Sequence, residues 1–193
     1  MAIFQGDKVS AKSQGFIRKF FNILQIFVVI GAILAVIYLF IFSPHEVTGK
    51  SMEPNYHQGE FLLADKISIK FKEQKRGDVV IFQFDDNTDY IKRVIAVAGE
   101  TVEIKDGLVY VNDTLLDESS YLSESTRTNS GRYLSENIKF RVPDNMVIAM
   151  GDNRSFSADS RDFGPIMTNQ IKGKVIIRVT PLSDFGFIKD PKY

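Results

Sequence analysis

A chain of 193 residues has room for one globular domain and a short additional segment. Its 24 basic and 24 acidic residues cancel, which gives no support to a nucleic-acid partner, because such a partner requires a basic surface and a high pI. The absence of cysteine excludes a disulfide framework and a thiol nucleophile. Two histidines and scattered carboxylates show no metal-ligand spacing, so no metal and no other cofactor is expected.

The strongest signal near the N-terminus is an uncharged run from Phe20 to Ser43, FFNILQIFVVIGAILAVIYLFIFS. About 20 apolar residues cross a hydrocarbon core of about 30 Å as a helix, so residues 20–43 are predicted to span a membrane. A cleaved secretory signal has an apolar core of only about 7–15 residues followed by small residues, whereas FSPHEV stands here. A buried core helix is the alternative, and the length of the run and its lack of a polar face argue against it.

The charges on the two sides of this run differ. Residues 1–19 contain four basic residues and one acidic residue, whereas the chain after Ser43 contains 20 basic and 23 acidic residues. Segments rich in Lys and Arg beside a span remain in the cytoplasm. The predicted organisation is therefore a cytoplasmic tail over 1–19, one transmembrane helix over 20–43 in the plasma membrane, and an extracytoplasmic domain over 44–193.

Most of that domain shows the alternating apolar pattern and the turn residues of β-strands. Strands are predicted within residues 59–69, 78–84, 89–99, 101–113, 138–142, 146–150 and 173–179. Asp106-Gly107 is predicted to be the two-residue turn of a hairpin. Residues 119–137, which are rich in serine, predict an exposed and mobile loop. The predicted fold class is mainly β, on a single N-terminal transmembrane helix.

Two basic residues interrupt the apolar strand pattern of YIKRVIAVAG, residues 90–99. Period-two alternation predicts one face with Tyr90, Lys92, Val94 and Ala96 and another with Ile91, Arg93, Ile95 and Val97. Burial of the lysine would lower its pKa and provide a neutral amine, which can take the proton of a serine hydroxyl. Ser51, in TGKSMEPNY, is the candidate serine. The alternatives are a solvated edge strand with an outward lysine and an ordinary loop serine.

A third polar segment, MGDNRSFSADSRDFG, occupies residues 150–164. Its many pairable charges and hydroxyls indicate an ordered hydrogen-bond network. With the apolar run and the segments GKSMEPNY, RGDVVIF and YIKRVIAVAGE, it makes residues 20–180 resemble the bacterial type I signal peptidases, membrane-bound serine endopeptidases that remove signal peptides from exported proteins. The single anchor and the short interval before GDNR resemble the compact Gram-positive form.

The resemblance implies roles for the residues around the serine. It implies that Ser51 is the nucleophile, that Lys92 is the general base, and that the Ser157 hydroxyl orients the lysine amine. The backbone N–H of Ser51 matches one oxyanion donor. Gly49 stands where some members of the family hold a second, hydroxyl donor, so only backbone or water could act there.

It also implies two supporting ion pairs and a set of substrate-binding positions. The pairs are Asp159 with Arg161 and Asp152 with Arg93. The positions that match the substrate pockets of the family are Val47, Met52, Tyr90 and Ile91. Asn55 and Tyr56 depart from the threonine and the leucine that are usual in the family.

The implied partners are the lipid bilayer and preproteins that carry small residues at the first and third positions before the cut. Eight residues separate Ser43 from Ser51 and reach at most about 29 Å, so the site is expected near the membrane surface. Three alternatives remain: a non-catalytic anchored β-domain that acts in binding or assembly, a self-cleaving Ser-Lys protease, and a Ser-His hydrolase that uses His45 or His57. The oligomeric state is left open.

Overall fold

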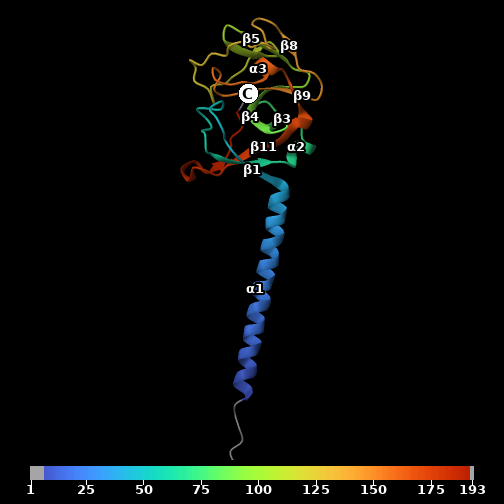
Figure 1. Ribbon diagram of the computed structural model, residues 1–193, viewed down its shortest axis with the longest axis vertical. Coiled ribbons are helices and arrows are strands. Elements are labelled where there is room, and N and C mark those ends of the chain that lie inside the picture. Colours follow the sequence, from blue (N-terminus) through green and yellow to red (C-terminus); the bar gives the residue numbers. More distant parts are fainter. Residues whose placement is uncertain (1–6, 192–193) are drawn as a thin grey trace, which may run out of the picture. The chain divides into compact units, whose positions relative to one another are not determined.

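The chain folds into an N-terminal helical unit and a β-unit that begins at Phe42. The computed structural model describes residues 7–191, without the side chains of residues 7–14 and residue 39. Residues 1–6 of the predicted cytoplasmic tail lie outside the described residues. The predicted fold class, mainly β with one N-terminal apolar helix, is confirmed (Figure 1).

Helix α1 runs from Asp7 to Ile41 and contains a segment, Gly15–Tyr38, that is long and apolar enough to cross a membrane. The helix therefore begins earlier than the predicted span and ends before Phe42. Phe42 and Ser43, which the prediction placed in the span, belong instead to the first strand. Pro44 gives the physical reason, because a proline disfavours helical geometry at the residue before it and cannot donate a helical hydrogen bond.

The β-unit contains two antiparallel sheets. The larger has the order β1-β2-β11-β3-β4-β9-β10, with β12 also paired to β11, and the smaller has the order β7-β6-β5-β8. The strands of the larger sheet are β1 Phe42–Glu46, β2 Phe61–Asp65, β3 Val79–Asp85, β4 Thr88–Val97, β9 Met146–Met150, β10 Ile166–Met167, β11 Ile171–Arg178 and β12 Gly186–Phe187. Those of the smaller sheet are β5 Thr101–Lys105, β6 Leu108–Val111, β7 Thr114–Leu115 and β8 Phe140–Arg141.

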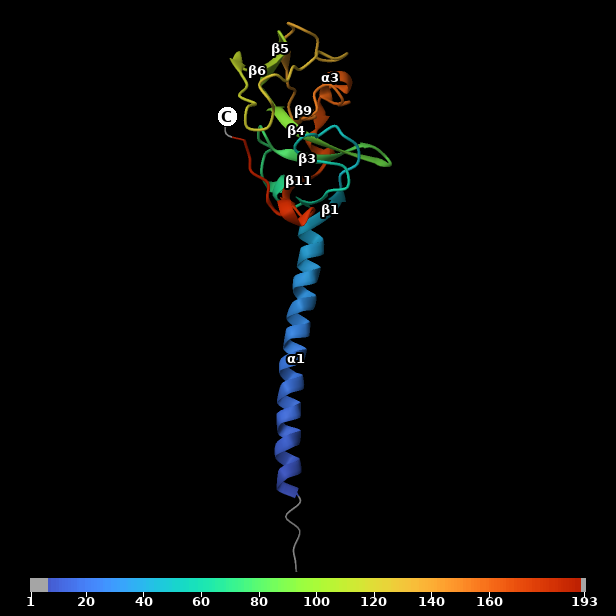
Figure 2. The same cartoon turned by 90° about the vertical axis from the view of Figure 1, so that its left-hand side faces the viewer.

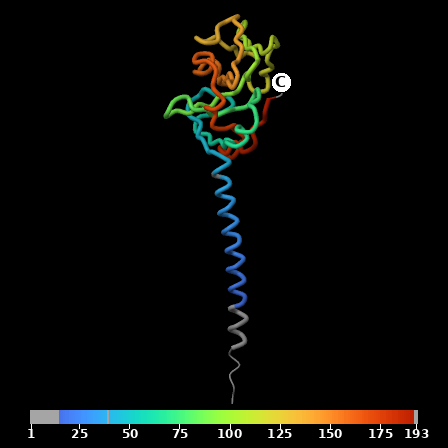
Figure 3. The backbone as a smooth tube through the Cα atoms, turned by 90° about the vertical axis from the view of Figure 1, so that its right-hand side faces the viewer, coloured from blue at the N-terminus to red at the C-terminus, as the bar shows by residue number. Residues whose placement is uncertain are grey.

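Four short helices complete the unit: α2 Ser68–Phe71, α3 Ser160–Phe163, η1 Thr168–Gln170 and η2 Leu182–Asp184. Figure 2 shows β5 and β6 at one end of the unit and β1 and β11 at the other, with β3 and β4 between them. The β3–β4 hairpin extends away from the body of the unit (Figures 2 and 3).

Local sequence rules predicted the β5–β6 hairpin of the smaller sheet well. The Asp106-Gly107 turn is confirmed, since β5 ends at Lys105, β6 begins at Leu108, and both turn residues have positive φ. The strand predicted across 59–69 stops at Asp65 instead. There the Asp65 carboxylate accepts hydrogen bonds from the backbone of Ile67 and Ser68 and turns the chain into α2.

The alternation predicted for β4 holds as far as Ile95. The register of β4 against β9 shifts between Val94 and Ala96, which places a β-bulge at Ile95. Beyond the bulge the faces exchange: Ala96 packs with Ile95, and Val97 packs beside the cluster that contains Val94. The predicted faces of Ala96 and Val97 are therefore wrong, whereas Lys92 and Arg93 lie before the bulge and keep opposite faces.

Residues 119–137 form no strand or helix, but the prediction that they are exposed is wrong at three positions. Tyr121, Thr128 and Leu134 are buried. Arg154 causes part of this burial, since its guanidinium donates to the Thr128 hydroxyl and to the Glu118 carboxylate just before the segment. Leu134 joins the apolar core between β5, β6 and β9. The segment thus folds against residues 150–164.

Candidate active site

The serine lies in a tight turn whose apolar side chains are buried in the core. The N–H groups of Asn55 and Tyr56 both donate to the Met52 carbonyl, at 3.0 and 2.9 Å. Met52 and Tyr56 are 1% and 3% exposed and pack in one core cluster with Val47. Because the residue after Ser51 is fixed in the core, the Ser51 hydroxyl is held at the edge of the unit instead of moving with a loose loop.

Lys92 reaches this hydroxyl from the middle of β4. Its side chain lies opposite Val80 of β3, and the residue is 3% exposed. The ammonium donates to Ser51 Oγ at 2.8 Å and to the Ile91 carbonyl at 2.9 Å, and it lies 5.0 Å from the centre of the Tyr90 ring. Each of these three contacts of the amine is with a neutral group.

Burial lowers the pKa of Lys92 to about 8, because it disfavours the charged form, and this effect outweighs the opposing attraction of Asp159 and Asp152. An amine with this pKa is partly neutral near pH 7. A neutral amine at 2.8 Å from a hydroxyl can accept its proton. The pair therefore has the geometry and the proton affinity of a nucleophile with its base.

Arg93, the next residue of β4, points to the other face and is held by a paired charge. Its guanidinium donates to both Asp152 oxygens, at 2.8 and 2.6 Å, and lies over the Tyr121 ring. Asn55 donates to the same carboxylate at 2.9 Å and so connects the serine turn to this pair. The hydrogen bonds and the charge of Asp152 outweigh burial and raise the pKa of Arg93, which keeps its proton.

The second predicted pair is also formed. Arg161 donates to both oxygens of Asp159 at 2.8 Å, and both side chains are buried. Burial raises the pKa of Asp159, but the Arg161 hydrogen bonds overcome it and hold the pKa below its usual value. Asp159 also accepts from the Gly151 N–H at 2.9 Å, so the pair fixes the backbone beside the serine.

Gly151 shows how closely the serine turn and residues 150–164 approach each other. A side chain at this position would overlap the Ser51 carbonyl oxygen and the Ser157 hydroxyl. The Ser157 hydroxyl lies close by with its oxygen buried, and its interaction with the Asp159 carboxylate helps to lower the pKa of Asp159 against the effect of burial. The expected bond between Ser157 and Lys92 is not among the contacts of the amine, which donates to the Ile91 carbonyl. The orienting role of Ser157 stays a prediction.

A pocket of about 270 Å³ opens beside Ser51 and Lys92. Of the predicted substrate-binding residues, Val47, Tyr90 and Ile91 line it, whereas Met52 lies in the core beneath the serine turn. Gly49 also lines it with φ +85°, a left-handed conformation that favours glycine, and a Cβ there would meet nothing within 4 Å. The other lining residues are His45, Glu46, Thr48, Lys50, Leu62, Ile81, Asp89, Phe156 and Ala158.

Sequence reasoning missed the contact between Asn153 and the backbone of the serine turn. The Asn153 N–H donates to the Ser51 carbonyl at 2.9 Å, and its side-chain amide donates to the Lys50 carbonyl at 3.0 Å. The only signal was the presence of Asn153 in GDNR, because the partners lie about a hundred positions earlier in the chain.

Neither His45 nor His57 donates to Ser51 in the hydrogen bonds of residues 7–191, where the hydroxyl has Lys92 as its partner. In the same residues no group of three or more His, Asp or Glu side chains could hold a metal ion.

Known proteins are similar to this chain over most of its length. The family model described as signal peptidase, peptidase S26, matches residues 20–180. A signal peptidase I from Bacillus caldolyticus is 36% identical over 161 residues, which cover 80% of this chain and 88% of the relative. A signal peptidase IB from Staphylococcus aureus (strain MRSA252) is 35% identical over 171 residues, which cover 83% and 89%. A crystal structure of a signal peptidase I from Enterococcus faecalis is 28% identical and covers 53% of this chain and 97% of that one, with a TM-score of 0.44. The family match and the two sequence relatives confirm the resemblance drawn from the motifs: the chain belongs to the signal peptidase family, peptidase S26.

Proposed function

We propose that the protein is a membrane-anchored serine endopeptidase that removes signal peptides from exported preproteins, with Ser51 and Lys92 as its catalytic dyad. The observation that carries this proposal is the 2.8 Å contact between Lys92 Nζ and Ser51 Oγ, made by a buried lysine whose pKa burial lowers to about 8. The relatives named signal peptidase I and IB supply the substrate class.

The reaction follows from the positions of these groups. Neutral Lys92 takes the proton of Ser51 as its oxygen attacks the scissile carbonyl carbon, and the Ser51 N–H donates to the oxyanion that forms. Protonated Lys92 then gives this proton to the leaving amine, and the signal peptide remains attached to Ser51 as an ester. Water, losing a proton to Lys92, attacks the ester carbonyl, and the proton returns to the Ser51 oxygen as the bond breaks.

The two arginine–carboxylate pairs bear on the proton affinity of the lysine amine. Burial lowers the pKa of Lys92, Asp159 and Asp152 raise it, and Arg161 lowers it. We infer that Arg161 and Arg93 serve the dyad by compensating these carboxylates. The Ser157 hydroxyl, whose oxygen is buried beside Gly151, is proposed to fix the direction of the lysine amine once substrate is bound.

The pocket beside the dyad accounts for a preference for small residues. Its volume of about 270 Å³ must hold several residues of an extended peptide, so little space remains for each side chain next to the cut. Val47 and Ile91 make the lining apolar near the serine. We expect alanine at the first and third positions before the cut, and poor cleavage when leucine replaces the first of them.

The membrane orientation is part of the proposal. The basic residues before the span keep the N-terminus in the cytoplasm, which places the β-unit outside. Because the chain has no cysteine, a single Ser125→Cys variant carries one thiol, at an exposed position. A membrane-impermeant maleimide should label it in intact cells, and labelling only after lysis would reverse the orientation.

The test of the proposed function uses the full chain in neutral detergent. Wild type should cut a preprotein with an Ala-X-Ala site at the bond after the second alanine, and sequencing of the new N-terminus identifies the bond. Ser51→Ala and Lys92→Ala should leave the preprotein intact while keeping the unfolding temperature of the wild type. Cleavage by either variant at the wild-type rate would remove that residue from the mechanism.

A further inference from the structure

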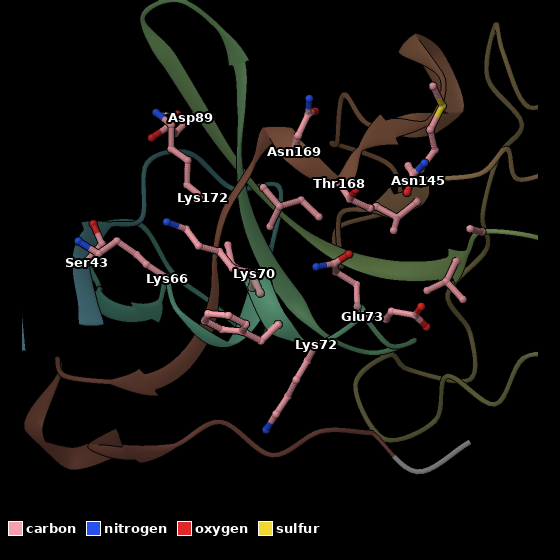
Figure 4. Close-up of a pocket in the computed structure, with 18 of the residues that line it drawn as sticks. Ser43, Lys66, Lys70, Lys72, Glu73, Asp89, Asn145, Thr168, Asn169 and Lys172 are labelled. Carbon is pink, nitrogen blue, oxygen red and sulfur yellow. Dashed lines mark ion pairs between the residues drawn. The ribbon is translucent and has the colours of Figure 1, made fainter. Parts of the chain in front are cut away.

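A second and larger cavity, of about 940 Å³, adjoins the pocket of the dyad, and the two share His45 and Asp89. All of its lining residues belong to the β-unit, and they come from β1, the α2 region, both ends of β4, the β9 region, η1 and β11 (Figure 4). The mechanism proposed above uses none of its lysines. We refer to it as the lysine cavity.

The charge of the lysine cavity is unbalanced. Lys66, Lys70, Lys72 and Lys172 line it, against two acidic residues, Glu73 and Asp89. Asp89 is occupied by Lys172 at 2.7 Å, and Lys70 has no ion pair among the described residues. Burial lowers the pKa of His45 and outweighs the opposing effect of Asp89, and Lys172 and Lys66 lower the pKa further, so this imidazole adds no positive charge near pH 7.

The lysines are also oriented together. Figure 4 shows Lys66 and Lys70 extending toward the side of the cavity where Ser43 lies, whereas Lys72 points away from them. Phe71, between Lys70 and Lys72 in sequence, lines the same cavity and is 83% exposed. Ammonium groups beside an exposed aromatic ring form a surface that is polar and apolar at once, as at membrane interfaces.

The covalent chain limits how far the cavity can lie from the end of the candidate span. The candidate span ends at Tyr38, and Ser43 lines the cavity five residues later, so the two lie at most about 18 Å apart. The headgroup layer adds roughly 5–8 Å on each side of the hydrocarbon core. If α1 spans a membrane, as the proposed function requires, the Ser43 side of the cavity lies within reach of lipid headgroups.

We propose that the lysine cavity binds the phosphate of an anionic phospholipid headgroup, with Lys66 and Lys70 as the binding residues. The unbalanced positive charge favours a phosphate, and the exposed Phe71 ring beside it favours a phosphate that carries acyl chains over a free ion. Such a contact would fix the β-unit at the membrane surface, where a preprotein emerges from its own membrane segment.

The test measures lipid binding by the full chain. The protein in neutral detergent is titrated with phosphatidylglycerol or phosphatidylcholine, and bound lipids are counted by native mass spectrometry. Each lysine near an anionic lipid surface strengthens binding roughly fivefold. The double variant Lys66→Gln with Lys70→Gln should therefore weaken phosphatidylglycerol binding by about twenty- to thirtyfold. Phosphatidylcholine binding should not change.

The matched control removes two lysines from the neighbourhood of the smaller sheet. Lys105→Gln with Lys139→Gln has the same net charge as the test variant but leaves the cavity intact, and it should bind phosphatidylglycerol as wild type does. Ser51→Ala should also bind as wild type, so a failure of the peptidase proposal would not affect this result. Both double variants should cleave a soluble signal-sequence peptide at the wild-type rate, which verifies the fold.

Three results would overturn the proposal. Equal losses in the test and control variants would reduce the effect to overall charge. Displacement of phosphatidylglycerol by an equal concentration of inorganic phosphate would make the cavity a site for free phosphate. Unchanged lipid binding together with slower preprotein cleavage in the test variant would assign the lysine cavity to the preprotein.

Discussion

The two sheets of the β-unit bury different kinds of residue. In the smaller sheet the buried side chains are apolar, such as Ile104 and Val109, and none of the charged residues of β5 to β8 is buried. In the larger sheet, two adjacent basic residues of β4, Lys92 and Arg93, are each 3% exposed. A buried charge costs several kcal/mol unless it is compensated, so stability alone does not explain them.

Lys92 and Arg93 differ from each other as well. The Arg93 guanidinium is paired with the Asp152 carboxylate. The hydrogen bonds and the charge of Asp152 raise the pKa of Arg93 despite burial. Lys92 contacts a hydroxyl and a carbonyl, and burial lowers its pKa. One strand thus carries a paired charge next to an amine whose pKa burial lowers.

The largest effect is expected from removing the dyad. Ser51→Ala and Lys92→Ala should each lower kcat by roughly 10⁶-fold, and the double variant should be no slower than either, because the two act as one unit. Lys92→Arg should be equally inactive, since a guanidinium stays protonated. Single-turnover rates on a signal-sequence peptide measure all four, and additive losses would separate the serine from the lysine.

The structural role of the neighbouring pair can be broken separately. Asp152→Ala leaves Arg93 buried without its partner and should lower the free energy of unfolding by about 3–5 kcal/mol. Lys139→Ala removes half of an exposed ion pair, with Asp113, and should leave the unfolding temperature unchanged. Thermal unfolding of the full chain in detergent compares the two variants. Equal effects would show that burial does not determine how much an ion pair contributes to the stability of this protein.

Ser157 tests whether the lysine needs orientation beyond its contact with Ser51. Ser157→Ala should lower kcat by roughly ten- to a thousandfold, within the range of a well-placed acid or base, while the acid limb of the pH profile moves little. Unchanged kinetics would make Ser157 an ordinary buried hydroxyl. A large shift of the limb would make it a group that sets the pKa of Lys92.

Gly151 tests the packing around the serine turn. Gly151→Ala would displace the Ser51 carbonyl, and a shift of about 1 Å can cost up to about a hundredfold in kcat. Gly186→Ala is the control, because a Cβ there meets nothing within 4 Å and the backbone is not left-handed. If both variants retain full activity, the close approach of the two segments does not position the nucleophile.

Predictions from sequence succeeded where the determining interactions are local. The Asp106-Gly107 turn follows from two residues that tolerate positive φ, and β9 was predicted with its observed bounds from an apolar run before a glycine. The motif resemblance also brought Ser51 and Lys92 together, although 41 positions separate them.

The errors in β4, in residues 119–137 and at Asn153 share a physical cause, which is pairing between distant segments. The bulge at Ile95 depends on the register of β4 against β9, and no residue of β4 signals it. Thr128 is buried because Arg154, 26 positions later, donates to it, and a serine-rich segment gives no sign of such a contact. The hydrogen bond from Asn153 to Lys50 joins residues 103 apart.

The pH dependence of kcat/KM on a soluble peptide tests the central claim most directly, because this parameter reports groups of the free enzyme. Burial lowers the pKa of Lys92 to about 8, and only the neutral amine can take the serine proton. Activity should therefore rise with pH through an acid limb at about 8 and level off above it. An acid limb near the unperturbed lysine value of about 10.4 would contradict the account, since Lys92 would then keep its proton as an ordinary solvated lysine does.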